Sequence, residues 1–463
     1  MSKKTNNTKV CKFGGTSMAN AETIGRVADI IKSDDTRRFV VVSAPGKRRS
    51  SDIKVTDLLY ACHDALAGGG GYFDAAFEVV VKRFESIIKE SGVKGVDIKA
   101  EKSDITRRVA ALAKKGGKGI AEARDYLASR GEYLAAKLTA AVLGGGWEFI
   151  DAAEIIAFDQ SGNFLPEKTN ELCVKRLAKV IGGAVIPGFY GSVQGETPSR
   201  IKTFSRGGSD VSGAIIARAA GASVYENWTD VDGFLKADPR LVDSPKLIDV
   251  LTYKELRELS YMGANVLHPE SIFPVRVSDI PINIRNTFNP DYKGTMIVPT
   301  KFFVKGCYER EKAGITGIAG RKDFVAIGVE KSMMNNELGF VRRILSVFER
   351  HGISIEHIPT GIDTVSVIVE RIDEEVRESV IAGIAADCAP DNIEVIQGLA
   401  LIAVVGHGMI RRTGAAADVF DVLAKAGINV RMIDQGSSEL NIIIAVDNAD
   451  FEKAIKALYG LVS

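Results

Sequence analysis

Residues that form disulfides or protein-held metal sites are scarce in this sequence. Only 5 of its 463 residues are cysteine, and 5 are histidine. The cysteines are far apart, odd in number and form no CxxC pair, which is typical of reduced core thiols and not of a disulfide framework. The histidines show no metal-ligand spacing. We therefore expect neither a disulfide scaffold nor a metal held by protein ligands alone.

An excess of charge of one sign and long apolar runs are also missing. The formal net charge is +1, so no basic excess indicates a nucleic acid or a membrane surface as partner. No apolar run reaches the roughly 20 residues that a bilayer span needs. The chain begins MSKKTNNTKV, with lysines but no apolar stretch of the kind found in secretory signals. These absences predict a cytoplasmic protein without nucleic-acid or membrane partners.

The first 300 residues alternate short β-rich runs with helical patterns. Residues 9–13 and 39–42 predict buried strands, and residues 21–31 between them have apolar side chains at helical spacing. Further strands are expected at residues 148–151, 184–187, 223–227 and 280–285. This alternation predicts an α/β domain with a mostly parallel sheet and helices on both faces. The active site of such a domain lies in the loops beyond the carboxyl ends of the strands.

Two regions depart from this alternation. Residues 68–120 are rich in Gly, Lys, Ala and Glu and predict a helical insertion, with a helix over 73–90. The last third contains a repeat with a single offset of 75 residues, which relates 324–329 to 399–404, 347–358 to 422–433, and 365–369 to 440–444. Because three separate blocks share one offset, the sequence predicts two copies of a small α+β module. The alternative, two unrelated βαβ segments, is disfavoured.

The segment VCKFGGTS places a lysine and two glycines between a predicted strand and a predicted helix. Lys12 ends the strand, Gly14 and Gly15 let the backbone approach an anion, and Thr16 and Ser17 lie where the helix begins. Amide groups at a helix N-terminus favour phosphate, and a neighbouring lysine supplies the charge that phosphoryl transfer needs. The spacing is not that of a Walker P-loop. Taken alone, the pattern fits an ordinary strand-to-helix turn equally well.

Two more glycine-containing turns follow later strands. SAPG begins at Ser43, and SRGGSD contains Arg206, Ser209 and Asp210. The arginine offers a planar fork for a carboxylate, the serine a hydroxyl or a helix cap, and the aspartate a group that could order a lysine or magnesium-bound water. Each turn could also be a capped surface loop. Three such turns in one α/β domain together indicate a phosphorylated ligand.

Several motifs occur in a fixed order along the chain: KFGGTS, SAPG with VTDLL, SRGE, SRGGSD, TDVDG with ADPR, and GANVLHP. With the doubled C-terminal module, this order resembles the aspartate kinases, a branch of the amino acid kinase family, over essentially the whole chain. The resemblance implies an open α/β sandwich of the amino acid kinase type followed by two ferredoxin-like (βαββαβ) ACT domains. The implied boundaries are 1–300 for the catalytic domain, 324–390 for the first ACT domain, and 314–320 with 392–463 for the second.

The implied reaction is ATP-dependent phosphorylation of the β-carboxylate of L-aspartate to 4-phospho-L-aspartate, the first step toward lysine, threonine and methionine, with Mg²⁺ carried in by ATP. Another amino acid kinase, acting on a related carboxylate or a nucleoside monophosphate, and a non-catalytic amino acid sensor are the alternatives. An aspartate carboxylate is ionised at neutral pH, since its reference pKa is about 3.9, so no general base is required.

The resemblance also assigns roles to residues. Lys12 would stabilise the transferring phosphoryl group, and Asp210 would organise the catalytic centre. The implied aspartate-binding residues are Thr56, Glu132, Arg206 and Ser209, with Arg206 on the α-carboxylate and Glu132 on the α-ammonium group. The implied ATP-binding residues are Gly14, Gly15, Thr16, Ser17, Ser43, Gly207, Gly208, Thr229, Asp230, Arg240 and Asn265. Three positions depart from common family residues: Leu235, Ala237 and Asn265.

The doubled module implies regulation by an amino acid. The stretch similar to the effector site of lysine-sensitive relatives contains Met334, Gly339, Phe340, Val341, Ser354, Glu356 and Thr360. Glu356 could supply a carboxylate to a cationic effector, which favours lysine over threonine, although a lone glutamate on a strand is more commonly exposed. Pairing of ACT domains between chains implies a homo-oligomer, either a dimer or a tetramer.

Overall fold

The computed structural model describes residues 7–69, 72–196, 199–205, 207–264, 267, 272–304, 314–410 and 412–462. The chain divides into two compact units. The first comprises Met1–Gly233 and Val266–Phe302, and the second comprises Phe234–Asn265 and Phe303–Ser463. None of the helices in the described ranges combines the length and the hydropathy that a bilayer crossing requires.

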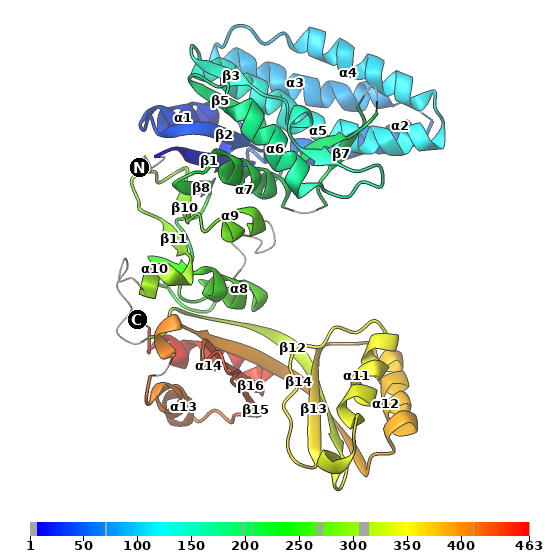
Figure 1. Ribbon diagram of the computed structural model, residues 1–463, viewed down its shortest axis with the longest axis vertical. Coiled ribbons are helices and arrows are strands. Elements are labelled where there is room, and N and C mark those ends of the chain that lie inside the picture. The colour runs from blue at the N-terminus through cyan, green and yellow to red at the C-terminus, as the bar shows by residue number, and fades with distance from the viewer. Residues whose placement is uncertain are drawn as a thin grey trace. The chain divides into compact units, whose positions relative to one another are not determined.

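A central sheet organises the first unit (Figure 1). Its strands are β1 (Lys9–Phe13), β2 (Arg37–Val42), β3 (Trp147–Phe149), β5 (Gly183–Pro187), β8 (Val224–Thr229), β10 (Ile282–Asn286) and β11 (Thr295–Val298). They lie in the order β3-β5-β2-β1-β8-β10-β11. All neighbours are parallel except β10 and β11. The carboxyl ends of β1, β2, β8 and β10 therefore meet at one edge, where the glycine turns follow.

Helices cover both faces of this sheet. Cys11 and Phe13 point into a hydrophobic core shared with α1 (Ala21–Lys32), α3 (Phe73–Ser91) and α5 (Gly117–Leu143). Since side chains alternate along a strand, Lys12 points to the opposite face, where it meets α7 (Gly208–Ala220). A small second sheet contains β4 (Ala157–Phe158), β6 (Tyr190–Val193) and β7 (Ile201–Thr203).

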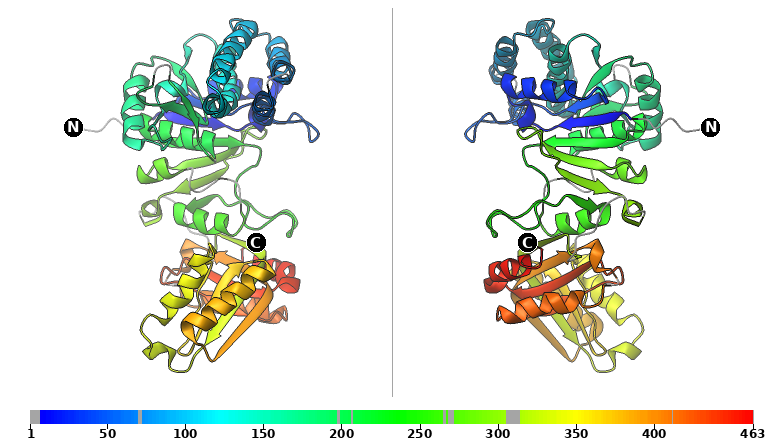
Figure 2. Two further views of the ribbon diagram at one scale, coloured as in Figure 1. Left: turned by 90° about the vertical axis from the view of Figure 1, so that its right-hand side faces the viewer. Right: turned by 90° about the vertical axis from the view of Figure 1, so that its left-hand side faces the viewer.

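The described residues between 68 and 120 are mainly helical. It contains α3 and α4 (Ile98–Ala113), which pack beside α5 and α2 (Val55–Ala67). The two views in Figure 2 show these helices, coloured blue to teal, grouped at one end of the first unit. Three more α-helices lie within residues 166–304 of the described chain: α6 (Pro166–Leu177), α9 (Phe273–Val277) and α10 (Thr300–Val304).

An antiparallel sheet organises the second unit. Its strands are β12 (Gly317–Glu330), β13 (Thr364–Glu370), β14 (Asn392–Val405), β15 (Met432–Asp434) and β16 (Asn441–Asp447), in the order β13-β12-β14-β16-β15. Helices α11 (Phe340–Arg350), α12 (Glu374–Cys388), α13 (Ala415–Lys425) and α14 (Phe451–Tyr459) accompany it, and β9 (Val250–Thr252) and α8 (Tyr253–Tyr261) belong to the same unit. The long strands β12 and β14 run side by side (Figure 1).

The two long strands serve both copies of the repeated module. Residues 324–330 pair with β13, and 326–330 also pair with 392–396. Residues 399–405 pair with β16, and 401–405 also pair with 317–321, while Phe324 and Leu399 pair with each other where the two halves meet. We therefore propose that 392–396 complete the first ACT module. The expected boundary placed them in the second module instead. The first module then consists of residues 324–396, inserted between the strands of the second.

The single offset of 75 residues does not extend through the whole repeat. Val325 pairs with Val369. Ala400 is the equivalent of Val325 at this offset, and it pairs with Val446, which follows Val369 by 77 positions. The connection that precedes β16 is therefore two residues longer than the one that precedes β13. Sequence matching without a gap could not detect this, because both strands are rich in Val and Ile and match at either offset.

Candidate active site

An ion pair between Lys12 and Asp210 lies at the carboxyl edge of the first sheet. Lys12 is 7% exposed, and its Nζ is 2.8 Å from Oδ1 of Asp210 in the first turn of α7. Asn227 on β8 donates from Nδ2 to the same oxygen at 2.9 Å. The Tyr225 hydroxyl donates to the backbone carbonyl of Asp210 at 3.2 Å. Groups from β1, β8 and α7 thus hold one ammonium group at the edge where the glycine turns meet.

The turns after β1 and β2 are in direct contact. The amide of Gly46 donates to the carbonyl of Gly15 at 2.8 Å, and the amide of Gly14 donates to the carbonyl of Trp228 at 3.1 Å. A Cβ on Gly46 would lie 2.7 Å from the backbone of Gly15, so no larger residue fits without displacing the turn. The short 3-10 helix η1 (Thr16–Met18) and α1 follow at once. The result is a backbone surface that a phosphate group can approach.

The N-terminus of α7 adjoins these two turns. Gly207 caps the helix with a φ of 56°, which favours glycine because the conformation is left-handed. The hydroxyl of Ser43 donates to that of Ser209 at 2.8 Å. A Cβ on Gly188 would lie 2.6 Å from Cβ of Ser209, so strand β5 also ends against this helix. The amides at the N-terminus of α7, from Gly208 onward, therefore lie at the same edge of the sheet as Lys12.

Polar residues after β8 and β10 complete the edge. Asp230 accepts hydrogen bonds from the hydroxyls of Thr16 at 3.1 Å and Thr229 at 3.2 Å. The hydroxyls of Ser17 and Thr287 are 2.7 Å apart. The first helical turn after β1 is therefore tied to the ends of both β8 and β10.

Glu132 is a buried carboxylate on α5 beside the Ser43 turn. It is 5% exposed, accepts from the amide of Ala44, and its Oε2 has no hydrogen-bond partner in the described part of the chain. Burial raises its pKa to about 8, and the Ala44 amide opposes that shift. A Cβ on Gly131 would lie 2.7 Å from Cβ of Ala44, so α5 packs directly on this turn. An unsatisfied buried oxygen costs about 1–3 kcal/mol, which a cationic ligand would relieve.

Thr56 lies at the start of α2, whose first amide, Val55 N, donates to the carbonyl of Pro45 at 3.0 Å. It thus follows the same turn that packs on Glu132. Arg240 belongs to the second unit, where it is 83% exposed at its side chain and pairs with Asp238 at 2.6 Å. Arg206 and Asn265, two further residues predicted from the sequence, lie outside the described residues.

Arg83 holds the turn after β2 in place, a role that was not predicted from the sequence. This buried side chain of α3 donates from Nη2 to the carbonyls of Gly46 at 2.8 Å and Ala19 at 3.2 Å. Its Nη1 bonds Asp52 at 2.7 Å. An arginine among the buried Val80, Val81 and Phe84 was the available signal, because a charge on the apolar face of a helix requires partners.

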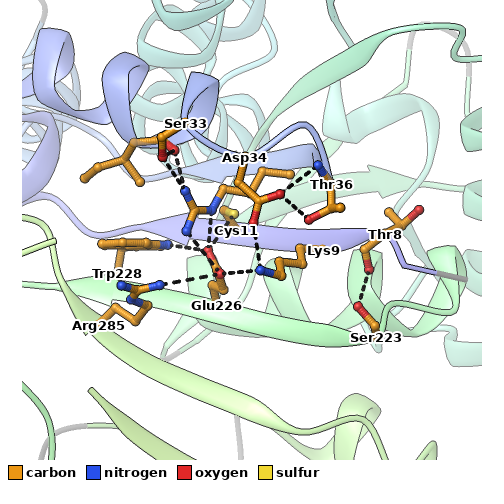
Figure 3. Close-up of polar contacts among 12 residues, drawn as sticks. Thr8, Lys9, Cys11, Ser33, Asp34, Thr36, Ser223, Glu226, Trp228 and Arg285 are labelled. Carbon is orange, nitrogen blue, oxygen red and sulfur yellow. Dashed lines mark hydrogen bonds and ion pairs between the residues drawn. The ribbon is translucent and has the colours of Figure 1, made fainter. Parts of the chain in front are cut away.

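A second buried cluster lies on the opposite face of β1 and β8 (Figure 3). Glu226 accepts hydrogen bonds from Arg37 Nε at 2.8 Å and from Trp228 Nε1 at 3.0 Å, and Lys9 Nζ is 3.6 Å away. Although burial alone would raise the pKa of Glu226, the hydrogen bond and charge of Arg37 hold it below its usual value. The cluster supports the strand that carries Asn227, and sequence analysis did not identify it.

No set of three or more His, Cys, Asp or Glu side chains within the described ranges is arranged to hold a metal ion. Asp230 is nevertheless a carboxylate at the site edge, and it accepts hydrogen bonds from the hydroxyls of Thr16 and Thr229. Its charge is therefore available to a cation that enters with a ligand.

The predicted effector residues lie in the first ACT module of the second unit. Met334 is buried in the short helix η3 (Met334–Asn336), and Gly339, with a φ of 77°, caps α11, which begins with the buried Phe340 and the half-buried Val341. Thr360 pairs with Val365 next to the end of β12, so it lies at the same end of the sheet as Met334. Ser354 is exposed.

Glu356 lies farther along this edge. Its amide donates to the carbonyl of Ile368, whereas Thr360 lies opposite Val365, a separation of three residues on β13, or about 10 Å. The strand expected to carry Glu356 is present only as isolated bridges, one of which joins His357 to Ile368. Pro359 contributes to this, because it has no amide proton for the ladder.

The carboxylate of Glu356 is only partly satisfied. The Tyr261 hydroxyl of α8 bonds it, and burial together with this carboxylate raises the pKa of Tyr261 to about 12. Oε2 of Glu356 is buried without a hydrogen-bond partner among the described residues. The neighbouring His357 bonds Asp434 through Nδ1 at 2.8 Å. Glu356 is thus not the exposed strand residue that base rates favour.

Comparisons with known proteins agree with this architecture. The profile of the amino acid kinase family matches residues 7–286, and an ACT domain profile matches residues 402–460. Aspartokinase 3 of Bacillus subtilis is 38% identical over 97% of this chain and 98% of its own length. The crystal structure of aspartate kinase from Clostridium acetobutylicum is 44% identical with a TM-score of 0.86, covering 99% of this chain and 100% of that chain.

A more distant relative has been solved in two states. Escherichia coli aspartokinase III in complex with aspartate and ADP is 27% identical, with a TM-score of 0.71, covering 98% of this chain and 100% of that chain. The same enzyme in complex with lysine and aspartate has a TM-score of 0.72, covering 98% and 99%.

The fold and these comparisons define an amino acid kinase domain joined to ACT modules, as the sequence predicted. Relatives of similar length match nearly the whole chain. The chain therefore belongs to the aspartate kinases within the amino acid kinase family.

Proposed function

We propose that the chain transfers the γ-phosphoryl group of ATP to the β-carboxylate of L-aspartate. The observation that carries this proposal is the Lys12–Asp210 ion pair beside two touching glycine turns, with the unsatisfied Glu132 next to the second turn. The complex of the Escherichia coli relative with aspartate and ADP supports the choice of substrates. A non-catalytic sensor is disfavoured because Lys12 and Asp210 are both present and paired.

Catalysis rests on positioning and charge. Lys12 is held by Asp210, so its ammonium group is in place to neutralise charge that develops on the transferring phosphoryl group. Amides of the Gly14 and Gly208 turns would line the phosphates. Mg²⁺ bound to ATP would neutralise the β- and γ-phosphates, and Asp210 and Asp230 are the carboxylates of this edge that would contact the ion or its waters.

The acceptor needs alignment and no deprotonation. Arg206 would hold the α-carboxylate of aspartate, and Glu132 would accept hydrogen bonds from the α-ammonium group, while Thr56 and Ser209 orient the substrate. A β-carboxylate oxygen, already ionised, then attacks the γ-phosphorus in line, and ADP leaves. The cationic substrate group also satisfies the unpaired Oε2 of Glu132.

Lysine is the effector we propose for the first ACT module. Glu356 Oε2 is buried and unpaired within the described chain, and an ammonium group would complete its hydrogen bonding. Threonine would bring no positive side chain. Coupling of about 1–3 kcal/mol between effector and substrate would be ordinary. We also propose that ACT modules of two chains pair, since residues 353–360 form an edge with few ladder bonds.

The effector proposal is tested by titrating lysine, threonine and methionine separately against kinase activity. Lysine should inhibit the wild type and lose most of its effect on Glu356→Ala, whereas Glu349→Ala, an exposed change on α11, should leave inhibition unchanged. Inhibition by threonine alone, or full lysine inhibition of Glu356→Ala, would place the effector elsewhere. The molar mass of the purified protein, measured by light scattering, distinguishes a monomer from a dimer or a tetramer.

The acceptor is tested by an ATP-dependent hydroxamate assay across carboxylic amino acids. We expect aspartyl hydroxamate to form, with glutamate and N-acetylglutamate giving little product. A preference for either of these would assign a different kinase of the family. No product from any acceptor, by protein that binds ATP, would favour the sensor.

A further inference from the structure

The first unit contains a pocket beside α1 that the proposed reaction does not use. Its volume is about 380 Å³. Its buried lining consists of Ile30, Arg37, Trp228 and Thr287, with the half-buried Arg285. Its exposed lining consists of Arg26, Asp29, Ser33, Pro290 and Asp291. The inner wall is thus cationic and aromatic, and it belongs to the cluster drawn in Figure 3.

Arg285 is the least satisfied cation of this wall. Its side chain is 16% exposed, and Nη2 donates to the carbonyls of Pro290 at 2.5 Å and Tyr292 at 3.2 Å. Nη1 lies 3.9 Å from Oε1 of Glu226, too far for a hydrogen bond, and Nε is buried with no partner in the described part of the chain. The guanidinium group lies 4.6 Å from the Trp228 ring centre. The N–H groups of Nη1 and Nε therefore have no hydrogen-bond acceptor among the described residues.

The carboxylate nearest to Arg285 is already occupied. Glu226 accepts two hydrogen bonds from Arg37, at 2.8 and 3.3 Å, and also pairs with Lys9 at 3.6 Å. Lys9 in turn pairs with Asp34 at 2.7 Å. Three cations of this cluster thus share two carboxylates. A charge that stays uncompensated when buried is costly, so an anion at Arg285 would be favoured.

The rim limits what kind of anion fits. Arg26 is half exposed and pairs with Glu22 at 2.9 Å, an exposed contact worth little, so its guanidinium group can turn to a ligand. Asp29 and Asp291 are exposed acidic residues at the same rim. They oppose a large polyanion at long range, but water and salt screen them.

We propose that this pocket binds a small oxyanion, a carboxylate or a phosphate, through Arg285 and Arg26. Ser33 and Thr287 belong to the same lining, where the hydroxyl of Ser33 already donates to the carbonyl of Ile30 and that of Thr287 bonds Ser17, so the arginines are the groups that would contact the anion. The shared chemistry is a compact group with two or three oxygens that a guanidinium fork can contact in pairs.

Occupancy of the pocket should reach the phosphate-binding turn. Thr287 in the lining bonds Ser17, and the carbonyl of Trp228, also in the lining, accepts from the amide of Gly14. A ligand that orders these residues should therefore change the KM for ATP more than the KM for aspartate. This consequence rests on the proposed function, whereas binding to the pocket does not.

The test is calorimetric titration of the full chain with inorganic phosphate and, separately, with malonate. Wild type should bind at least one of them saturably. Arg285→Gln and Arg26→Glu should each weaken binding about 10- to 100-fold, because each removes a charge-assisted contact. Lys12→Met should leave this binding intact, which separates it from phosphate in the active site. Arg107→Gln, an exposed change on α4, is the matched control.

Each outcome decides the proposal. Binding of phosphate alone identifies a tetrahedral ligand, and binding of malonate identifies a carboxylate. Absence of saturable binding, or binding that Lys12→Met removes and Arg26→Glu does not, overturns the proposal. If Arg285→Gln fails to fold because the 290–292 turn is lost, Arg26→Glu alone decides, since its side chain is half exposed. If the kinase assay fails but the pocket still binds phosphate or malonate, the proposed reaction is refuted and the pocket proposal is not affected.

Discussion

Two charged clusters lie on opposite faces of the same pair of strands, and their differences separate chemistry from support. In the register of β1 and β8, Lys12 is opposite Asn227, and Cys11 is opposite Glu226. Lys12 makes one ion pair, with Asp210, at the sheet edge where the glycine turns lie. Glu226 is 2% exposed and is bonded from several directions. A saturated buried ion can only hold structure, whereas a singly paired one can exchange its partner for a ligand.

The largest effect should come from breaking the supporting cluster. Glu226→Ala leaves the buried Arg37 without its carboxylate and takes the nearest carboxylate away from the half-buried Arg285, which should cost about 3–5 kcal/mol in the free energy of unfolding. Urea denaturation followed by circular dichroism measures this. A loss below about 1 kcal/mol would show that the cluster is hydrated and not structural.

The catalytic face should respond in the opposite manner. Lys12→Ala should lower kcat by about 10²- to 10³-fold or more, because one preorganised charge at the transferring group is lost. The free energy of unfolding should change little, since Asp210 keeps its bond to Asn227. Near-normal turnover by folded Lys12→Ala would refute the assigned site.

Arg83 should give an intermediate result, since it supports the turn without touching a substrate. Arg83→Lys removes the fork that joins Gly46, Ala19 and Asp52, with an expected cost of about 1.5–3 kcal/mol. The KM for ATP should rise, and added guanidinium ion should partly restore the activity of Arg83→Ala. Arg48→Lys, which changes an exposed partner of Asp52, is the control. If Arg83→Lys and Arg48→Lys changed the KM for ATP equally, Arg83 would have no special role in positioning the turn after β2.

The smallest effect should be a pH dependence at Glu132. Its pKa is raised from 4.5 to about 8 in the folded chain, so its contribution to stability is fully present below pH 4.5 and is lost as the pH rises toward 8. Aspartate binding needs the ionised form, so the KM for aspartate should fall as the pH rises through about 8. Glu132→Gln should raise this KM and flatten its pH profile. An unchanged profile in the variant would assign the titration to another group.

Strongly patterned features could be predicted from the sequence. The buried strands of the first sheet and the helix at 21–31 follow from apolar periodicity, and the fold class and family are confirmed. The position of Lys12 near the end of a buried strand, just before two glycines, could be predicted for the same reason. The predicted roles of individual site residues stay predictions, and those of Arg206 and Asn265 concern residues outside the described chain.

Other features could not be predicted, because they depend on contacts between distant segments. Glu226 and Arg37 are 189 positions apart, and Arg83 bonds a carbonyl oxygen of Gly46, 37 positions away. No local pattern reveals such partners. The assignment of residues 392–396 that we propose could not be read from the sequence for a related reason, since the continuous strand β14 pairs along its length with parts of both modules.

The most direct test of the central claim follows an oxygen atom. The chain is incubated with ATP, hydroxylamine and aspartate labelled with ¹⁸O in its β-carboxylate. Attack by that carboxylate on the γ-phosphorus makes a labelled oxygen the bridge of the acyl phosphate, and hydroxylamine then takes the acyl group. The account predicts that the released phosphate carries one ¹⁸O atom, seen as a shifted ³¹P NMR signal. Release of unlabelled phosphate while ATP is consumed would contradict it.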